Sequence, residues 1–342
     1  MSSVCIMLCE ALGFHTMDIR LAVDALIELS IVASFSRLGP AIRRRLFAWR
    51  GPSPGEMVGR TVLVTGPTSG LGRATADALA ALGARIVLVG RSEERLAGVR
   101  DELVKRHGED RFPIVVADMG SIADVKAAVD SILESESRLD VVIDNAAAIY
   151  PERMESPDGI EATLALTVVG PFTLIGGLLP LLRATPDARV ISVVSGGMYA
   201  QALPLDDLQY TRPTFSGARA YARAKRASVA LMREWARRLA DSGISFSAMH
   251  PGWADTPGLA DSLPGFYRFM GPLLRTVDEG IDTIVWLATD PAAAESGKLF
   301  LDRRSRPFDR APATRLTAAE RRRLWDLVVG LTGAPDPAPA SR

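Results

Sequence analysis

Hydrophobic residues in this chain of 342 residues form short runs that alternate with longer segments of helical spacing. Seven runs rich in Val, Ile, Leu or Phe have the length of strands, and most segments between them carry apolar residues at a period near 3.6. Near-continuous apolar strands joined by helices indicate a parallel sheet covered on both faces. The pattern predicts one doubly wound α/β domain over residues 58–311. The expected strands are 61–65, 85–90, 112–118, 140–144, 189–195, 245–250 and 298–302.

Residues 1–57 form a separate N-terminal extension in this prediction. Residues 18–37 have the spacing of an amphipathic helix, with Asp24 and Glu28 one turn apart on its polar face. Two interpretations remain open. The helix packs on the main domain or on a partner subunit, or it contacts a membrane peripherally, with its apolar face in the lipid and arginines 43–45 at the headgroups.

Residues 312–342 form the C-terminal segment. A helix is expected over about 318–331, because Thr317 and Glu320 have the spacing of a capping box. The last nine residues, rich in Pro and Ala, predict a disordered tail.

The composition of the chain limits the classes of partner and binding site to be expected. Forty basic and forty acidic residues cancel, so no global charge favours nucleic acid as a partner. Both cysteines, Cys5 and Cys9, lie in the first ten residues, which excludes a disulfide framework and is typical of a cytoplasmic protein. With His15 they supply three metal ligands and no fourth, so no metal site is expected. No transmembrane span is expected either.

The first predicted strand runs directly into a glycine-rich turn and then into a helical segment. Glycines let the backbone turn tightly and approach a pyrophosphate, and the helix N-terminus offers free N–H groups. At the start of the first βαβ unit this pattern predicts a dinucleotide site, with a tight turn that binds no ligand as the alternative. The candidate contacts are Gly66, Thr68, Ser69, Gly70, Leu71 and Gly72.

Arg91 follows the second predicted strand, where NAD-binding sites tend to carry an acidic residue. A planar guanidinium suits a 2′-phosphate, so NADP(H) is expected and NAD(H) is the less favoured alternative; Arg91 could also be a solvated arginine. Asp118 and Met119 follow the third strand and are placed to reach the adenine. Asp118 could equally be a turn residue or a helix cap ahead of Ser121.

Tyr221 and Lys225 stand four residues apart, so they share one face of a predicted helix. Lys225 is one of only four lysines in the chain. An ammonium near a phenol lowers the pKa of the phenol, and its flexible stem also allows it to donate to ribose hydroxyls. The pair therefore predicts acid–base chemistry at Tyr221.

The segments TGPTSGLG, RVISVVS, YARAK and HPGWADT, in this order, resemble the short-chain dehydrogenase/reductase family over residues 58–311. The resemblance implies a seven-stranded Rossmann sheet and NAD(P)-dependent oxidation or reduction. It implies that Tyr221 is the general acid/base, that Ser195 hydrogen-bonds the substrate carbonyl or hydroxyl, and that Lys225 lowers the pKa of Tyr221 and holds the nicotinamide ribose. The implied nicotinamide contacts are Pro251, Gly252, Trp253 and Thr256.

Two places depart from the family pattern. The usual Asn-Asn-Ala-Gly reads DNAA at 144–147, which leaves Asn145 and Ala146 as backbone contacts and puts Ala147 where a glycine admits the cofactor. Thr167 stands where the family carries an active-site asparagine. A threonine hydroxyl cannot offer both an amide donor and a carbonyl acceptor, which affects a proton relay through Lys225.

The main hypothesis is therefore an NADP-dependent oxidoreductase that acts on a lipophilic small-molecule carbonyl or alcohol. The segment 256–275 is rich in Leu, Phe, Tyr and Met and is predicted to be a lid over the substrate, with core packing as the alternative. The competing hypothesis is a cofactor-binding regulatory or scaffold protein with little turnover. By resemblance, members pair through the helices bearing Thr167 and Tyr221, so a homo-oligomer is also expected.

Overall fold

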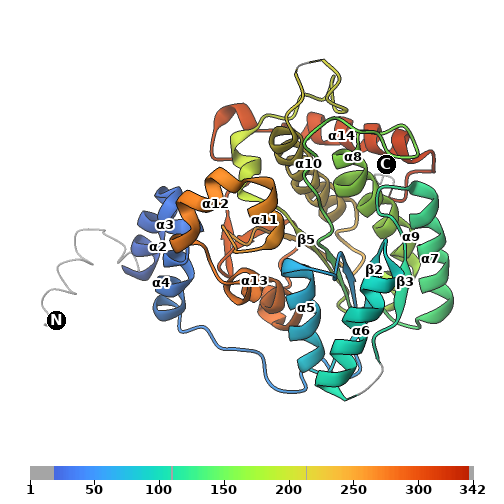
Figure 1. Cartoon of the computed structure of the whole chain (residues 1–342), viewed down its shortest axis with the longest axis horizontal. Helices are drawn as coiled ribbons and strands as arrows, with labels where there is room; N and C mark the ends of the chain where they lie inside the picture. Colours follow the sequence, from blue (N-terminus) through green and yellow to red (C-terminus); the bar gives the residue numbers. More distant parts are fainter. Residues whose placement is uncertain (1–18, 109–110, 213, 339–342) are drawn as a thin grey trace, which may run out of the picture.

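The computed structural model describes residues 19–108, 111–212 and 214–338, built around one twisted sheet (Figure 1). The strand order is β3-β2-β1-β4-β5-β6-β7-β8; the first seven strands in this order are parallel, and β8 runs antiparallel to β7. The α/β class is as predicted. The strands are β1 Thr61–Thr65, β2 Arg85–Gly90, β3 Ile114–Val116, β4 Val141–Asp144, β5 Arg189–Val193, β6 Ser245–Met249, β7 Lys298–Leu301 and β8 Arg304–Arg306.

The expected seven-stranded parallel sheet is wrong in one respect, because the sheet has eight strands and is mixed. Asp302 and Arg303 have φ angles of 53° and 55°, so a two-residue turn sends the chain back as a hairpin. The eighth strand reads Arg-Ser-Arg and has no apolar residue to reveal it. Its arginines serve in ion pairs with the N-terminal extension instead.

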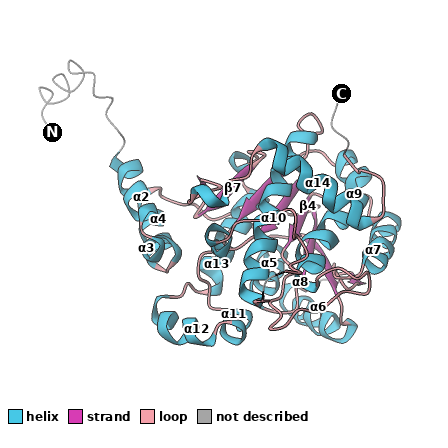
Figure 2. Cartoon of the chain, turned by 90° about the horizontal axis from the view of Figure 1, so that it is seen from above, coloured by secondary structure: helices cyan, strands magenta, loops and turns pink. Residues whose placement is uncertain are grey.

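Alternate residues of β1 enter different cores, as expected for a strand buried on both faces. Val62 and Val64 join a cluster with helices α5 Gly70–Ala81, α6 Glu93–His107 and α13 Val277–Thr289. Leu63 joins a larger cluster with α7 Ile122–Ser135, α9 Gly170–Ala184 and α10 Gly217–Arg238. Helices thus cover both faces of the sheet, as Figure 2 also shows.

One helical stretch among the described residues, Ala162–Ala184, is long and apolar enough to cross a membrane. It comprises α8 Ala162–Leu164, a π-helical turn Ala165–Val169 and α9. Of its most apolar window, 72% is buried inside the protein, where α9 packs on α7. It is therefore a core helix of the domain.

The C-terminal segment packs on α9 and α10. Helix α14, Ala318–Thr332, begins with the predicted capping box of Thr317 and Glu320. The Trp325 ring lies 4.7 Å from that of Phe172 and 4.6 Å from that of Trp235.

The chain beyond α14 is also attached to the domain. Asp336 pairs with Arg238 at 3.1 Å, and Ala338 is 2% exposed. The predicted disordered tail is thus wrong for residues 334–338, because they are packed; residues 339–342 lie outside the described residues. Helix α14 and this segment cover part of the α9–α10 surface through which pairing was expected.

The N-terminal extension is not the single helix predicted for 18–37. Helix α2, Ile19–Leu29, ends before Ser30, whose hydroxyl accepts a hydrogen bond from the amide of Ala33 and caps α3, Ile31–Phe35. Helix α4, Leu38–Leu46, follows. The three helices lie together at one side of the domain (Figure 1). Cys5, Cys9 and His15 lie outside the described residues.

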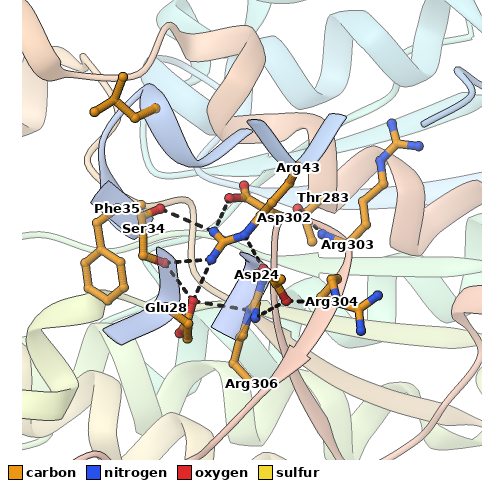
Figure 3. Close-up of polar contacts among 12 residues, drawn as sticks. Asp24, Glu28, Ser34, Phe35, Arg43, Thr283, Asp302, Arg303, Arg304 and Arg306 are labelled. Carbon is orange, nitrogen blue, oxygen red and sulfur yellow. Dashed lines mark hydrogen bonds and ion pairs between the residues drawn. The ribbon is translucent and has the colours of Figure 1, made fainter. Parts of the chain in front are cut away.

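The polar face of α2 faces the domain, and its apolar face is largely outside. Asp24 is 5% exposed, whereas Ile19 and Leu29 are 76% and 81% exposed. Arg43, expected at a lipid headgroup, is fully buried: its guanidinium donates to Asp24 at 2.7 Å, to Glu28 at 2.8 Å and to Asp302 at 2.6 Å (Figure 3). Ion pairs therefore attach this extension to the domain.

Candidate active site

The glycine-rich turn joins β1 to α5 at the carboxyl edge of the sheet. Gly66 and Gly70 have φ angles of 67° and 52°, which favour glycine. A Cβ on Gly72 would lie 2.2 Å from the Gly66 carbonyl oxygen, so the turn closes directly on the helix. Helix α5 begins at Gly70 with its first amide groups free of helical partners. This geometry fits a pyrophosphate, with Thr68 and the exposed Ser69 on the same turn.

Asn145, after β4, braces the glycine-rich turn. Its side-chain amide donates to the carbonyls of Thr65 at 2.9 Å and Gly66 at 3.3 Å. The backbone amides of Asn145 and Ala146 donate to the Thr65 hydroxyl at 3.0 and 2.9 Å. Ala147, which replaces the family glycine, is exposed and is not among the residues with positive φ. Its methyl group therefore does not strain the loop.

Arg91 and Asp118, the residues expected at the adenine end, follow β2 and β3. Arg91 is exposed after β2, and its charge opposes the burial that raises the pKa of Tyr150. Asp118 accepts a hydrogen bond from the Gly120 amide at 2.8 Å, as a turn residue does, while Ser121 caps α7. Met119 is buried, and its carbonyl lies against Gly170.

Tyr221 on α10 and Ser195 after β5 are brought together. Burial raises the pKa of Tyr221 to about 12, and a side-chain hydrogen bond with Ser195 opposes the rise. The predicted lowering by Lys225 is absent from this geometry, because its ammonium lies 5.9 Å from the Tyr221 ring centroid and donates to the Val193 carbonyl at 2.7 Å. At neutral pH Tyr221 therefore holds its proton.

Lys225 acts on Asp144 instead. Burial raises the pKa of Asp144 to about 6, although the Lys225 charge and a hydrogen bond from Ser192 oppose it. Burial lowers the pKa of Lys225, and Asp144 opposes that shift. The sequence showed Asp144 only as a departure from an asparagine and gave no sign of this pairing.

Thr167 lies beside Asp144 in the π-helical turn and is 1% exposed. Among the described residues, neither the Thr167 hydroxyl nor Asp144 Oδ1 has a hydrogen-bond partner. Both line a cavity of about 20 Å³, which has the size of one water molecule. Ser228 also lines it and donates to the Thr167 carbonyl at 3.1 Å. Thr167 therefore faces a small, mostly apolar cavity that it shares with Asp144.

The loop from His250 to Thr256, expected on the nicotinamide side, follows β6. Gly252 has a φ of 70°, and its amide donates to His250 Nδ1 at 3.3 Å. Burial, together with the charges of Arg275 and other arginines, holds the pKa of His250 well below its ordinary value, so the ring is neutral. A Cβ on Gly70 would lie 3.5 Å from Thr256 Cγ2, so this loop meets the glycine-rich turn. Pro251 and Trp253 are partly exposed beside it.

The segment 256–275 folds into α11 Pro257–Ser262 and α12 Pro264–Met270. Neither helix buries a residue except Met270, whereas Leu274 and Arg275 after them are buried, so core packing describes only the end of this segment. Phe266 packs edge-on against Trp253 with ring centroids 5.2 Å apart. The pair of helices thus lies on the surface beside the loop that carries Trp253.

Two residues near the site had no signal in the sequence. Phe35, from the N-terminal extension, packs on His250, and Arg275 donates to the Phe35 carbonyl. Neither belongs to a motif. His250 itself stands in the HPGWADT segment but was not singled out.

The chain belongs to the short-chain dehydrogenase family, whose model matches residues 60–264. It is 39% identical over 254 residues to dehydrogenase/reductase SDR family member 12 of Bos taurus, which covers 74% of this chain and 79% of the relative. Retinol dehydrogenase 14 of Homo sapiens is 32% identical over 319 residues, 86% of this chain and 92% of the relative.

Solved structures share the fold. A short chain dehydrogenase from Salmonella enterica has a TM-score of 0.62 at 23% identity and covers 75% of this chain and 100% of its own. An Escherichia coli CFT073 protein crystallised with NADPH has a TM-score of 0.60 at 24% identity and covers 74% and 100%. The family supports NAD(P)-dependent dehydrogenase/reductase activity on a small molecule for this chain.

The raised pKa of Asp144 predicts a pH-dependent stability difference. The folded pKa lies above the unfolded value near 3.9, so the stabilisation from the protonated carboxyl is complete below about pH 4 and is lost as the pH rises through about 6. Relative to Asp144→Asn, wild type should lose up to about 3 kcal/mol of unfolding free energy across this range. Urea unfolding of both proteins from pH 4 to 8 measures it. The exposed Asp241→Asn is the control; an Asp144→Asn difference independent of pH would contradict the prediction.

Proposed function

We propose that the protein transfers hydride between NADP(H) and a lipophilic carbonyl or alcohol, with Tyr221 as the proton donor or acceptor. The observation that carries this proposal is Tyr221 next to Ser195, close enough for the serine to oppose the rise in the tyrosine pKa, at the edge of the sheet that bears the glycine-rich turn. When bound, the nicotinamide supplies or accepts the hydride at the carbonyl carbon. Ser195 orients the substrate oxygen, and Tyr221 donates a proton to that oxygen in reduction.

The high pKa of Tyr221 favours the reductive direction at neutral pH. A phenol that keeps its proton can donate it to the alkoxide that forms as hydride arrives, whereas oxidation needs the phenolate. The proposed role of Lys225, on the same face of α10, is to bind the nicotinamide ribose, for which its flexible stem would turn from the Val193 carbonyl.

A lipophilic substrate is supported by the surface of α11 and α12 beside Trp253 and by a relative. Helices α11 and α12 present Phe266 near Trp253, and Phe269 is 84% exposed. Retinol dehydrogenase 14, a relative, is named for a lipophilic alcohol. The substrate class proposed here is an apolar aldehyde or ketone and the corresponding alcohol.

Tyr221→Phe should reduce turnover by about 10²–10⁴-fold, because it removes the proton donor and leaves the ring in place. NADPH consumption with a panel of lipophilic aldehydes and ketones measures the loss, and fluorescence titration should show that NADPH affinity is retained. Tyr210→Phe is the matched control, since the Tyr210 hydroxyl donates to the Thr214 carbonyl away from Ser195. If wild type binds NADPH but turns over no substrate, the cofactor-binding regulatory or scaffold function replaces this proposal.

Arg91→Ala should weaken NADPH binding by about ten- to a hundredfold and leave NADH binding nearly unchanged. The reason is the loss of a charge-assisted contact with the 2′-phosphate, worth about 1.5–3 kcal/mol. Titration with both nucleotides separates the effects, and the exposed Arg95→Ala on α6 is the control. An equal loss for NADH would show that Arg91 does not select the phosphate.

We also propose a cytoplasmic location with peripheral contact between the N-terminal helices and an anionic membrane. Exposed arginines 37, 44 and 45 lie on the same helices as the apolar surface. Paired copies of the chain are the alternative occupant of this surface. Its exposed apolar residues are Ile19, Leu21, Leu26, Leu29, Ile31, Val32, Leu38 and Ile42.

The double variant Leu26→Glu, Leu29→Glu should lose most binding to phosphatidylserine-containing vesicles, because it places two charges where the surface would enter lipid. Co-flotation of the full chain with vesicles is the measurement. Val58→Glu is the control, being 70% exposed outside these helices. Wild type that does not bind vesicles, has twice the monomer mass by light scattering and becomes monomeric in the double variant would contradict the membrane proposal. A second copy of the chain would then cover the surface.

A further inference from the structure

The end of α3 lies between two loops of the site. Phe35 is 3% exposed, and its ring centroid lies 4.6 Å from that of His250, 5.8 Å from that of Trp253 and 6.3 Å from that of Tyr199. Tyr199 belongs to the 3₁₀ turn Gly196–Ala200 that Ser195 begins. A residue of the N-terminal extension therefore touches both the loop that carries Ser195 and the loop that carries Gly252.

The lack of space at two glycines shows how closely these loops approach Phe35. A Cβ on Gly196, the residue after Ser195, would lie 2.5 Å from the Phe35 ring. A Cβ on Gly252 would lie 2.6 Å from the Phe35 carbonyl oxygen and 2.4 Å from Arg275 Nε. Real Cβ atoms do not approach this closely, so the two loops fit against Phe35 with no spare volume.

Backbone hydrogen bonds fix the same contact. The Phe35 carbonyl accepts from the Trp253 amide at 2.8 Å and from Arg275 Nε at 2.9 Å. Arg275 also donates to the Ser34 carbonyl at 2.6 Å and to Asp302 at 2.7 Å. Asp302 in turn accepts from Arg43 of α4, so the extension is held on both sides of Phe35 (Figure 3).

We propose that Phe35 is a positioning residue of the active site: it holds the Ser195 loop and the Gly252 loop against each other. The N-terminal helices are then part of the catalytic architecture as well as a surface for contacts. The kinetic part of this inference rests on the proposed function, because Ser195 and Gly252 matter through hydride transfer. Its structural part, the ordering of the two loops, does not.

The first test is kinetic. Phe35→Ala should lower kcat about tenfold or more, because small misplacements of catalytic groups cost large factors in rate. Phe35→Leu, which keeps most of the volume, should recover most of this loss. The matched control is Leu29→Ala, an apolar truncation on α2 at a position 81% exposed. A kcat unchanged in Phe35→Ala would overturn the proposal.

A double-mutant cycle tests the contact itself. Gly196→Ala should lower kcat, because its methyl group has to displace the Phe35 ring. Adding Phe35→Ala should then cost less than it does in wild type, since the small side chain makes room for the methyl group. Strictly additive losses in kcat would contradict direct positioning through this contact.

Hydrogen–deuterium exchange separates this inference from the proposed function. In Phe35→Ala, peptides covering 195–200 and 250–256 should exchange faster, including the Trp253 amide that Phe35 binds, while the β1 and β4 peptides should not change. If wild type turned over no substrate, the proposed function would be wrong, but the exchange measurement would still test whether Phe35 orders the two loops. Faster exchange throughout the chain, or none in these two loops, would overturn the positioning role.

Discussion

The buried guanidinium of Arg43 is the interaction on which the N-terminal part of the structure depends. Isolated in the protein interior, this charge would cost many kcal/mol, and so would the carboxylates around it. The cluster is tolerable because each charge has an opposite charge and a hydrogen bond: Asp24 and Glu28 come from α2, and Asp302 comes from the turn before β8. Arg306 of β8 completes it on Asp24, and with Arg43 it holds the pKa of Asp24 below its ordinary value although burial opposes this.

This constraint explains the inverted orientation of α2. An amphipathic helix usually buries its apolar side, but here the domain offers arginines, and the acidic side of the helix matches them. The apolar side is left outward as a consequence. The same attachment carries Phe35 to the edge of the sheet where the dinucleotide turn and the catalytic tyrosine candidate lie, so one electrostatic cluster links a surface and a site.

The parts of the fold that depend on local sequence pattern could be predicted from the sequence. Seven strands alternate with helices as the apolar runs indicate, and Gly66, Ser195 and Tyr221 stand at the sheet edge that their motifs predict. Strand β8 could not be predicted, because a strand of arginines and a serine has no hydrophobic period. Nor could Phe35 or Arg275 be found, because contacts between residues 240 positions apart leave no local pattern.

The contacts of Lys225 were harder still to predict from the sequence, because they depend on burial rather than on the spacing of residues. The four-residue interval to Tyr221 places both side chains on one face of α10, but the ammonium turns to the Val193 carbonyl and faces the carboxyl of Asp144. An asparagine at 144 would leave that buried cation without a charged partner; the aspartate supplies one and faces the cavity that Thr167 also lines. The two departures from the family pattern, at 144 and 167, thus line one small, mostly apolar cavity. The aspartate at 144 thus changes how the lysine is held, and Thr167 shares the cavity with that aspartate.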